Sequence, residues 1–172
     1  TKEASNVPVS VKTRTGIKKH DTENWIGHLL EQDPAAVILH CRTQKDQSEV
    51  PADWNEIKKA VDVRNASGKD IPLYGNGDVW SVPDALEKCE ATGADGVMVG
   101  RGIFHNPWMF NHPQPEISVA GKLDLLWQHV ELFTETWGPE KNFNILKRFF
   151  KIYTNNFHGA ARLRAELMET NN

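Results

Sequence analysis

The sequence has few cysteines and no long apolar run. Only two cysteines occur among its 172 residues, Cys41 and Cys89, and neither stands in a CxxC or Cys/His ligand spacing. The sequence therefore indicates neither a disulfide framework nor a zinc or other metal site. No stretch reaches the roughly 18 apolar residues of a membrane span, and the first residues show no signal-peptide pattern. We expect a cytoplasmic protein whose thiols are buried or half-buried.

The charges that are present are unevenly distributed. Hydrophobic residues make up 39% and charged residues 25% of the chain, as in an ordinary soluble domain. Residues 1–140 contain 14 basic and 21 acidic residues, whereas residues 141–172 contain 6 basic and 2 acidic residues. A basic C-terminal segment favours an anionic partner.

Short apolar segments alternate with segments of helical periodicity. The expected strands are residues 7–11, 36–40, 71–74 and 96–99. The expected helices between them are residues 22–32, 51–65 and 82–92, and Ser81 is the expected N-cap of the last, with Asp84 as half of a capping box. Repeated βα units of this kind build either a doubly wound sheet or a (β/α)₈ barrel.

Candidate functional residues lie at or just after the C-terminal end of each expected strand. They are Lys12, His40, Asn76 with Asp78, and Gly100 with Arg101. In a barrel, the C-terminal ends of the strands surround the active site. This ring of residues therefore favours the barrel over the doubly wound sheet.

Two glycine-containing turns follow the last two expected strands. The first lies in LYGNGDVWS at 73–81, where Gly75 and Gly77 let another group approach the backbone closely. The second lies in VMVGRGIFHN at 97–106. In many barrels the loops after the last two strands bind a phosphate group, and Arg101 would add donors to such a site. Plain turns without a ligand, with Arg101 in a surface ion pair, are the alternative that these residues leave open.

No further strand is expected after Asn106-Pro107. Helical patterns occur at 122–136, 143–155 and 160–169. The apolar residues of the second pattern are expected to face inward: Phe143, Leu146, Phe149, Phe150 and Tyr153. Lys147 and Lys151 are four residues apart and should share one helix face, which indicates a site for an anion or a simple solvated basic face. We expect a barrel-type domain at 1–110 and a helical domain at 116–172.

The chain resembles the tRNA-dihydrouridine synthase family in five segments that follow in the same order: PVSVKTRTG (8–16), HCRTQ (40–44), PADW (51–54), YGNGDV (74–79) and GADGVMVGRGIFHNPWMF (93–110). The last segment is the most specific. The resemblance implies an FMN-dependent (β/α)₈ barrel followed by a helical domain. It also implies the reduction of particular uridines in transfer RNA, with NADPH as the electron donor.

The resemblance assigns roles to individual residues. Lys12 and His40 match the family's flavin-contacting lysine and histidine. The FMN-phosphate turns of the family match Asn76, Gly77, Asp78, Gly100 and Arg101. An ammonium group such as that of Lys12 would stabilise the negative charge of a reduced flavin. The residues expected to contact RNA are Arg42, Lys147, Arg148, Lys151, Arg162 and Arg164, with Arg42 able to meet flavin instead.

The chain also departs from the family pattern. Cys41 stands where the family usually has glycine, and the loop KDQSEV differs, which indicates altered RNA contacts. The family's proton-donating cysteine precedes the segment matched here, so no catalytic residue is assigned, and Cys41 is not its replacement.

Four βα units make half of a barrel, and the opening TKEAS resembles the end of a helix. We therefore expect the C-terminal half of a synthase, inactive alone and able to self-associate through its open barrel edges. Two alternatives stay open: a non-catalytic tRNA-binding or structural remnant, and another FMN-dependent barrel oxidoreductase.

Overall fold

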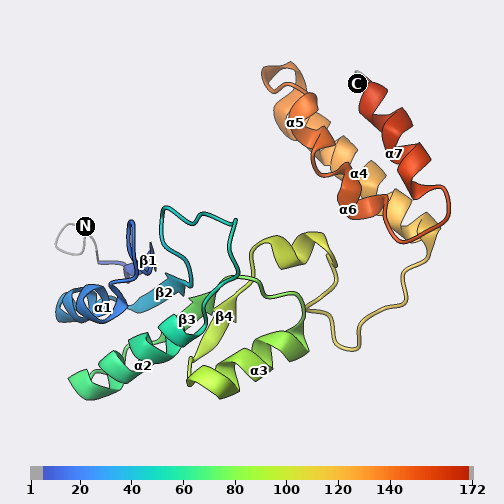
Figure 1. Cartoon of the computed structure of the whole chain (residues 1–172). Helices are drawn as coiled ribbons and strands as arrows, with labels where there is room; N and C mark the ends of the chain where they lie inside the picture. Colours follow the sequence, from blue (N-terminus) through green and yellow to red (C-terminus); the bar gives the residue numbers. More distant parts are fainter. Residues whose placement is uncertain (1–5, 171–172) are drawn as a thin grey trace. The chain divides into compact units, whose positions relative to one another are not determined.

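A computed structural model describes residues 6–170. The chain forms two compact units, Thr1–Ile103 and Phe104–Asn172 (Figure 1). The expected helix end at residues 1–5 lies outside the described part of the chain. Among the helices of residues 6–170, none is long and apolar enough to cross a membrane.

The first unit contains a parallel sheet. Its strands are β1 (Ser10–Arg14), β2 (Ala36–His40), β3 (Leu73–Asn76) and β4 (Gly96–Met98). Each strand pairs with the next in sequence, in the order β1-β2-β3-β4. A doubly wound sheet reverses its strand order at a switch point, whereas a barrel adds strands in sequence. The order confirms the prediction of a partial (β/α)₈ barrel. Within the described residues, β1 and β4 each have one neighbouring strand, and self-association through these edges stays a prediction.

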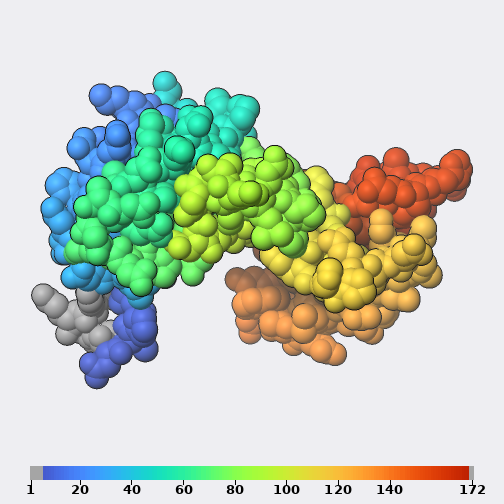
Figure 2. All heavy atoms as spheres, turned by 90° about the horizontal axis from the view of Figure 1, so that it is seen from below, coloured from blue at the N-terminus to red at the C-terminus, as the bar shows by residue number. Residues whose placement is uncertain are grey.

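Three helices cover one face of the sheet (Figure 1). They are α1 (Thr22–Glu31), α2 (Asn55–Ser67) and α3 (Val82–Thr92), and Figure 2 shows α2 and α3 side by side. The predicted N-cap of α3 is confirmed, because the Ser81 hydroxyl accepts the Asp84 N–H at 3.2 Å. The carboxylate of Asp84 in turn accepts the N–H of Trp80 at 2.9 Å, one residue before the position that a capping box uses.

The two faces of the sheet differ in their side chains. Val37, Leu39 and Leu73 are fully buried in a core that they share with residues of α1 and α2. Side chains alternate along a strand, so His40 lies on the face opposite to Leu39. The strand register aligns four residues across the C-terminal ends of the strands: Arg14, His40, Asn76 and Met98.

The predicted bounds of the first strand, the third strand and the second helix were wrong. The first strand begins at Ser10, after Pro8, which lacks an N–H to pair, and it continues through Lys12, which is therefore not at the strand end. The third strand likewise begins after Pro72 and includes Asn76. Helix α2 begins at Asn55 and not at Pro51, because the Asn55 N–H, which would bond to the carbonyl of Pro51 in a helix starting there, donates to Oδ1 of Asp53 at 3.0 Å.

The second unit is helical. It contains α4 (Val119–Trp137), the 3₁₀ turn η3 (Gly138–Glu140), α5 (Asn144–Lys147), α6 (Phe150–Tyr153) and α7 (Ala160–Glu169), and the 3₁₀ turn η2 (Arg101–Phe104) spans the unit boundary. The expected inward stripe is confirmed. Its residues belong to one cluster with Leu126 of α4, either buried in it or packed against it.

The helix predicted at 143–155 is two short helices in the structure. The N–H groups of Phe149 and Ile152 bond to carbonyl groups three residues earlier, those of Leu146 and Phe149. Such bonds are tighter than those of an α-helix. The apolar spacing could not reveal this break, since residues three apart share a face in both kinds of helix.

Candidate functional site

A pocket of about 570 Å³ lies at the C-terminal ends of the strands in the first unit. Of the row described above, Arg14, His40 and Asn76 line it. The turns after β3 and β4 supply further lining residues: Gly77, Asp78, Val79, Trp80, Gly100, Arg101 and Gly102. The loop after β2 adds Arg42, Gln44, Gln47 and Ser48. The structure thus brings together all the predicted cofactor residues except Lys12, which lies one row deeper in the sheet.

Lys12 reaches this pocket through Asn76. Its Nζ donates to Oδ1 of Asn76 at 3.1 Å, and Nδ2 of Asn76 donates to the backbone oxygen of Met98 at 2.7 Å. These bonds connect β1, β3 and β4. They orient the amide of Asn76, because an oxygen must face the ammonium and a nitrogen must face the carbonyl. Burial, followed by the charge of Arg14, lowers the pKa of Lys12.

The glycines at the end of β3 and just after it are required by the protein's own side chains. A Cβ at Gly75 would lie 2.3 Å from the ring of Trp54, and one at Gly77 would lie 2.8 Å from Cβ of Ala52. Gly77 also has a φ of +132°, which disfavours other residues. The indole N–H of Trp54 donates to the carbonyl of Gly77 at 2.9 Å and fixes the turn.

The turn after β4 is open at Gly100. A Cβ at Gly100 would have no atom within 4 Å among the described residues, so this side of the pocket has free space beside the backbone. There is no such space beside Gly102, because a Cβ there would lie 2.1 Å from the carbonyl oxygen of Val79. The two glycines thus differ: Gly100 leaves room for a ligand, and Gly102 allows the turns after β3 and β4 to touch.

Asp78 joins two arginines. Its Oδ2 accepts from Nη2 of Arg42 and from the N–H of Ala52, and its Oδ1 accepts from Nη2 of Arg101 at 3.2 Å. Arg42 is only 3% exposed and also donates from Nε to the carbonyl of Val50 at 2.6 Å. Arg101 is 53% exposed. Asp78 therefore holds one arginine inside the protein and one at the pocket surface.

The pocket favours anions. Its charged lining consists of three guanidinium groups, from Arg14, Arg42 and Arg101, and one carboxylate, from Asp78. Two positive charges therefore remain in excess. Burial, together with the charges of Arg14, Lys12 and Arg42, lowers the pKa of His40 to about 4, although Asp78 acts in the opposite direction. The imidazole is uncharged at neutral pH and can donate one hydrogen bond without adding charge.

Cys41 cannot act as an acid at this site. It is 1% exposed and packs in the core of the first unit. Burial raises the pKa of its thiol to about 12. Cys89 is half-buried, and burial raises the pKa of its thiol too. The expectation of two buried or half-buried thiols is confirmed.

The sequence patterns did not indicate a role at the site for Arg14, Gln44, Trp54 or Trp80. Arg14 follows Lys12 by two residues and so shares its face of β1, which is a signal that the sequence contained. Trp54 was part of a family segment, but only the fold shows its contact with Gly77. Nothing in the sequence placed Gln44 and Trp80 at the pocket.

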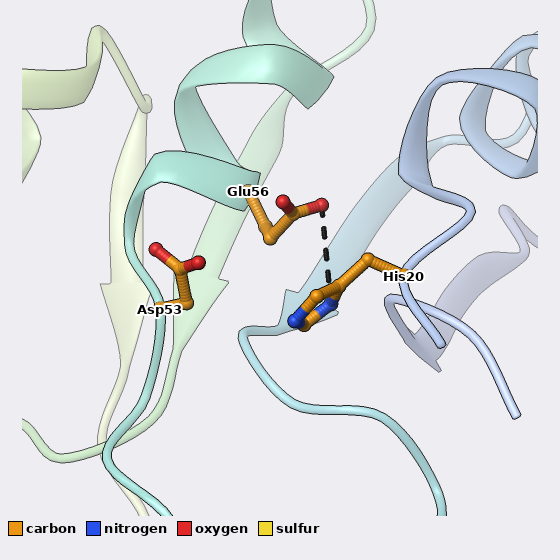
Figure 3. Close-up of side chains that lie close together, drawn as sticks. All are labelled: His20, Asp53 and Glu56. Atoms are coloured by element: carbon orange, nitrogen blue, oxygen red, sulfur yellow. Dashed lines mark ion pairs between the residues drawn. The ribbon is translucent and has the colours of Figure 1, made fainter. Parts of the chain in front are cut away.

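A second group of titratable side chains lies on the loops after β1 and β2 and on the first turn of α2 (Figure 3). His20, Asp53 and Glu56 have ligand atoms within 4.8 Å of one another. Glu56 is 3% exposed, but its carboxylate already accepts from Lys59 Nζ at 2.7 Å and from the Thr22 hydroxyl. The Glu56 carboxylate thus already has two donors, and its bond to Thr22 links α2 to α1.

Basic residues of the second unit converge on a pocket of about 370 Å³. It is lined by Lys147, Arg148, Lys151 and Arg164, together with apolar residues of α7. Lys147 is 7% exposed, and its Nζ donates to the carbonyl of Met168 at 2.7 Å. Arg162 is not part of this pocket and pairs with Glu166 at 2.8 Å. Lys147 and Lys151 therefore meet at a pocket, although they belong to different helices.

Comparison with known proteins agrees with this geometry. The family model described as dihydrouridine synthase (Dus) matches residues 1–172. A probable tRNA-dihydrouridine synthase of Staphylococcus aureus (strain MRSA252) is 42% identical over 169 residues, which are 97% of this chain and 52% of that protein. Probable tRNA-dihydrouridine synthase 2 of Bacillus subtilis (strain 168) is 40% identical over the same shares. The chain spans about half the length of these relatives. It belongs to the dihydrouridine synthase family.

Proposed function

We propose that the chain is the cofactor-phosphate part of a tRNA-dihydrouridine synthase, which reduces uridine to 5,6-dihydrouridine in transfer RNA with FMN and NADPH. The observation that carries the proposal is the pocket with excess positive charge at the C-terminal ends of four parallel strands. Because transfer RNA is the proposed substrate, the cytoplasm is the proposed location. The 172-residue chain alone is proposed to be inactive, since half a barrel cannot enclose a substrate.

The residues of the pocket fit the phosphate of FMN. Free space beside Gly100 allows close approach to the backbone, and the half-exposed Arg101 offers a guanidinium fork. The carboxylate of Asp78 would repel a phosphate, so its proposed role is to position Arg101 and not to bind the ligand.

Lys12, Asn76 and His40 lie deeper and are proposed to face the remainder of the cofactor. When bound, FMN supplies hydride transfer between NADPH and the uracil ring. Lys12 would place its ammonium where negative charge develops on reduction, and Asn76 keeps that ammonium in position. The uncharged imidazole of His40 would donate a hydrogen bond to the cofactor.

Arg101→Gln is expected to weaken FMN binding by roughly 10- to 100-fold, the loss of one charged hydrogen bond, while the fold is retained. The measurement is a titration of FMN fluorescence with the purified chain, and circular dichroism reports the fold. Lys58→Gln, which removes an exposed charge on α2 outside the pocket, is the matched control. Equal FMN affinity of both variants would show that Arg101 does not hold the phosphate.

We also propose that the basic pocket of the second unit contacts RNA phosphate. Lys151 and Arg148 are exposed, and the guanidinium of Arg148 lies 4.7 Å from the ring centre of Phe149. Arg164 is half-buried and donates to the carbonyl of Thr154 at 2.7 Å. The Nζ of Lys147 already donates to the carbonyl of Met168, so Lys147 would contribute its positive charge from inside the protein. Contacts of Arg42 and Arg162 with RNA stay predictions.

Arg148→Glu combined with Lys151→Glu is expected to weaken binding of transfer RNA and to reduce the slope of log affinity against log salt by roughly 1.4 to 1.8, for two lost phosphate contacts. Filter binding at several salt concentrations measures both quantities. The control is Lys141→Glu, whose ammonium lies over the ring of Trp137 and outside the pocket. If the control and the double variant change RNA affinity equally, the pocket has no specific part in RNA binding.

A further inference from the structure

The contact between Arg42 and His40 defines the state of the His40 ring. Nη1 of Arg42 lies 3.4 Å from Nε2 of His40. A guanidinium group can only donate hydrogen bonds and keeps its charge at all working pH values. The facing nitrogen must therefore be an acceptor, which places the single proton of the neutral ring on Nδ1.

Arg42 is held so that it cannot turn away from the ring. Nε donates to the carbonyl of Val50 at 2.6 Å and Nη2 donates to Asp78, which leaves Nη1 for His40. The side chain is 3% exposed. A buried guanidinium fixed at two other points has its third direction determined by the planar geometry of the group.

We propose that Arg42 is a positioning residue that fixes His40 as the neutral tautomer protonated on Nδ1. Within residues 6–170, the His40 ring has this one hydrogen-bond contact. The Nδ1–H is thus available to a group that enters the pocket lined by His40. The role differs from RNA contact, for which Arg42 has little exposed surface.

The charges around His40 support a neutral ring. Lys12 and Arg14 face it from β1, Arg42 from its own loop, and Asp78 from the turn after β3. The three cations disfavour the imidazolium, and the carboxylate favours it. In water, a histidine side chain carries its proton mainly on Nε2, so the Nδ1 tautomer is a state that the protein has to impose.

The test is nitrogen-15 NMR of the histidine side chains in the full chain at neutral pH. Two-bond proton–nitrogen correlations report which ring nitrogen carries the proton, and His40→Gln identifies the His40 signals among the 7 histidines. The wild-type chain is expected to show the Nδ1–H pattern. In Arg42→Met the pattern is expected to change to Nε2–H, with an upward shift of the His40 pKa.

Two further variants separate the possible causes. Arg42→Lys keeps the charge but not the planar fork, and it is expected to give the Nε2–H pattern with a smaller rise of the pKa than Arg42→Met. Arg64→Met removes an arginine paired with Asp95 in the same unit and is expected to leave the His40 pattern unchanged. A wild-type His40 protonated on Nε2, or an Nδ1–H pattern that persists without Arg42, would overturn the proposal. The wild-type spectrum alone can overturn the proposal, so the proposal can be tested even if one of the variants does not fold.

The identity of the acceptor for Nδ1–H rests on the proposed function. FMN titrated into the labelled chain is expected to shift the His40 Nδ1–H signal, whereas inorganic phosphate should shift it less because phosphate carries no flavin ring. FMN binding without a change at His40 would overturn the donor role. A chain that binds no FMN counts against the proposed function, and the tautomer is still decided by the spectra without ligand.

Discussion

Asp78→Ala is expected to lower the free energy of unfolding by about 3 kcal/mol, because it leaves the Arg42 guanidinium buried without its carboxylate. The Ala52 N–H loses its acceptor in the same variant. Removing one partner of a buried ion pair costs more than removing an exposed pair, since the remaining charge cannot be hydrated. Urea unfolding at neutral pH, followed by circular dichroism, measures the loss.

The control for this variant is Glu31→Ala. Glu31 is 69% exposed and pairs with the equally exposed His28. Exposed pairs contribute at most about 1 kcal/mol. If both variants lost the same small amount, Asp78 would not be the anchor of Arg42.

The effect of Asp78→Ala should depend on pH. Burial disfavours the Asp78 carboxylate, but the bonds from Arg42 and Ala52 outweigh it and lower the pKa. A lowered pKa stabilises the folded chain above the pKa of the unfolded carboxyl, about 3.9, and this contribution is lost as the pH falls through the folded value. The difference in stability between the wild-type chain and the variant should therefore be constant from pH 7 to about 5 and shrink below about pH 4.

Gly102→Ala is expected to destabilise the first unit by about 2 to 3 kcal/mol. The new methyl group would lie 2.1 Å from the carbonyl oxygen of Val79 and 3.0 Å from Cγ1 of Val99. A backbone carbonyl cannot rotate away as a side chain can, so the turns after β3 and β4 must separate. FMN affinity should fall as well, because Arg101 precedes the displaced residue.

Gly100→Ala separates packing from ligand binding. No atom would lie within 4 Å of its methyl group among the described residues, and stability should change by less than about 0.5 kcal/mol. The same methyl group would stand in the free space proposed for phosphate and should weaken FMN binding. A Gly102→Ala chain as stable as Gly100→Ala would contradict the packing argument.

Most of the secondary structure could be predicted from the sequence where local signals were strong. The strand Ala36–His40 and the helices Val82–Thr92 and Ala160–Glu169 have the bounds that were predicted. Helix α3 has a polar N-cap and Gly93 in the left-handed conformation after its last residue, and both are readable signals. Errors arose where side-chain contacts decide, as at Asn55, whose N–H bonds to the carboxylate of Asp53 and not to the carbonyl of Pro51, so that α2 starts later than predicted.

The site was predictable in its location but not in its contacts. Parallel strands bring their C-terminal ends together, so His40, Asn76 and Arg101 were expected at one pocket, and they line it. Neither pattern nor spacing could show that Arg42 turns inward to Asp78. The glycines were read as room for a ligand, and only at Gly100 does the backbone leave that room. At Gly75 the space is filled by Trp54.

The loop between β2 and α2 is attached to the protein in a way that tolerates sequence divergence. Arg14 donates to the carbonyl oxygens of Thr43 at 2.7 Å and Gln47 at 3.3 Å, and Arg42 donates to that of Val50. Every residue type has a carbonyl oxygen, so these attachments do not depend on the side chains at the accepting positions. Substitutions in KDQSEV can therefore accumulate over evolution while the loop keeps its path, and changes at Gln47 and Ser48 would alter the lining of the pocket without releasing the loop.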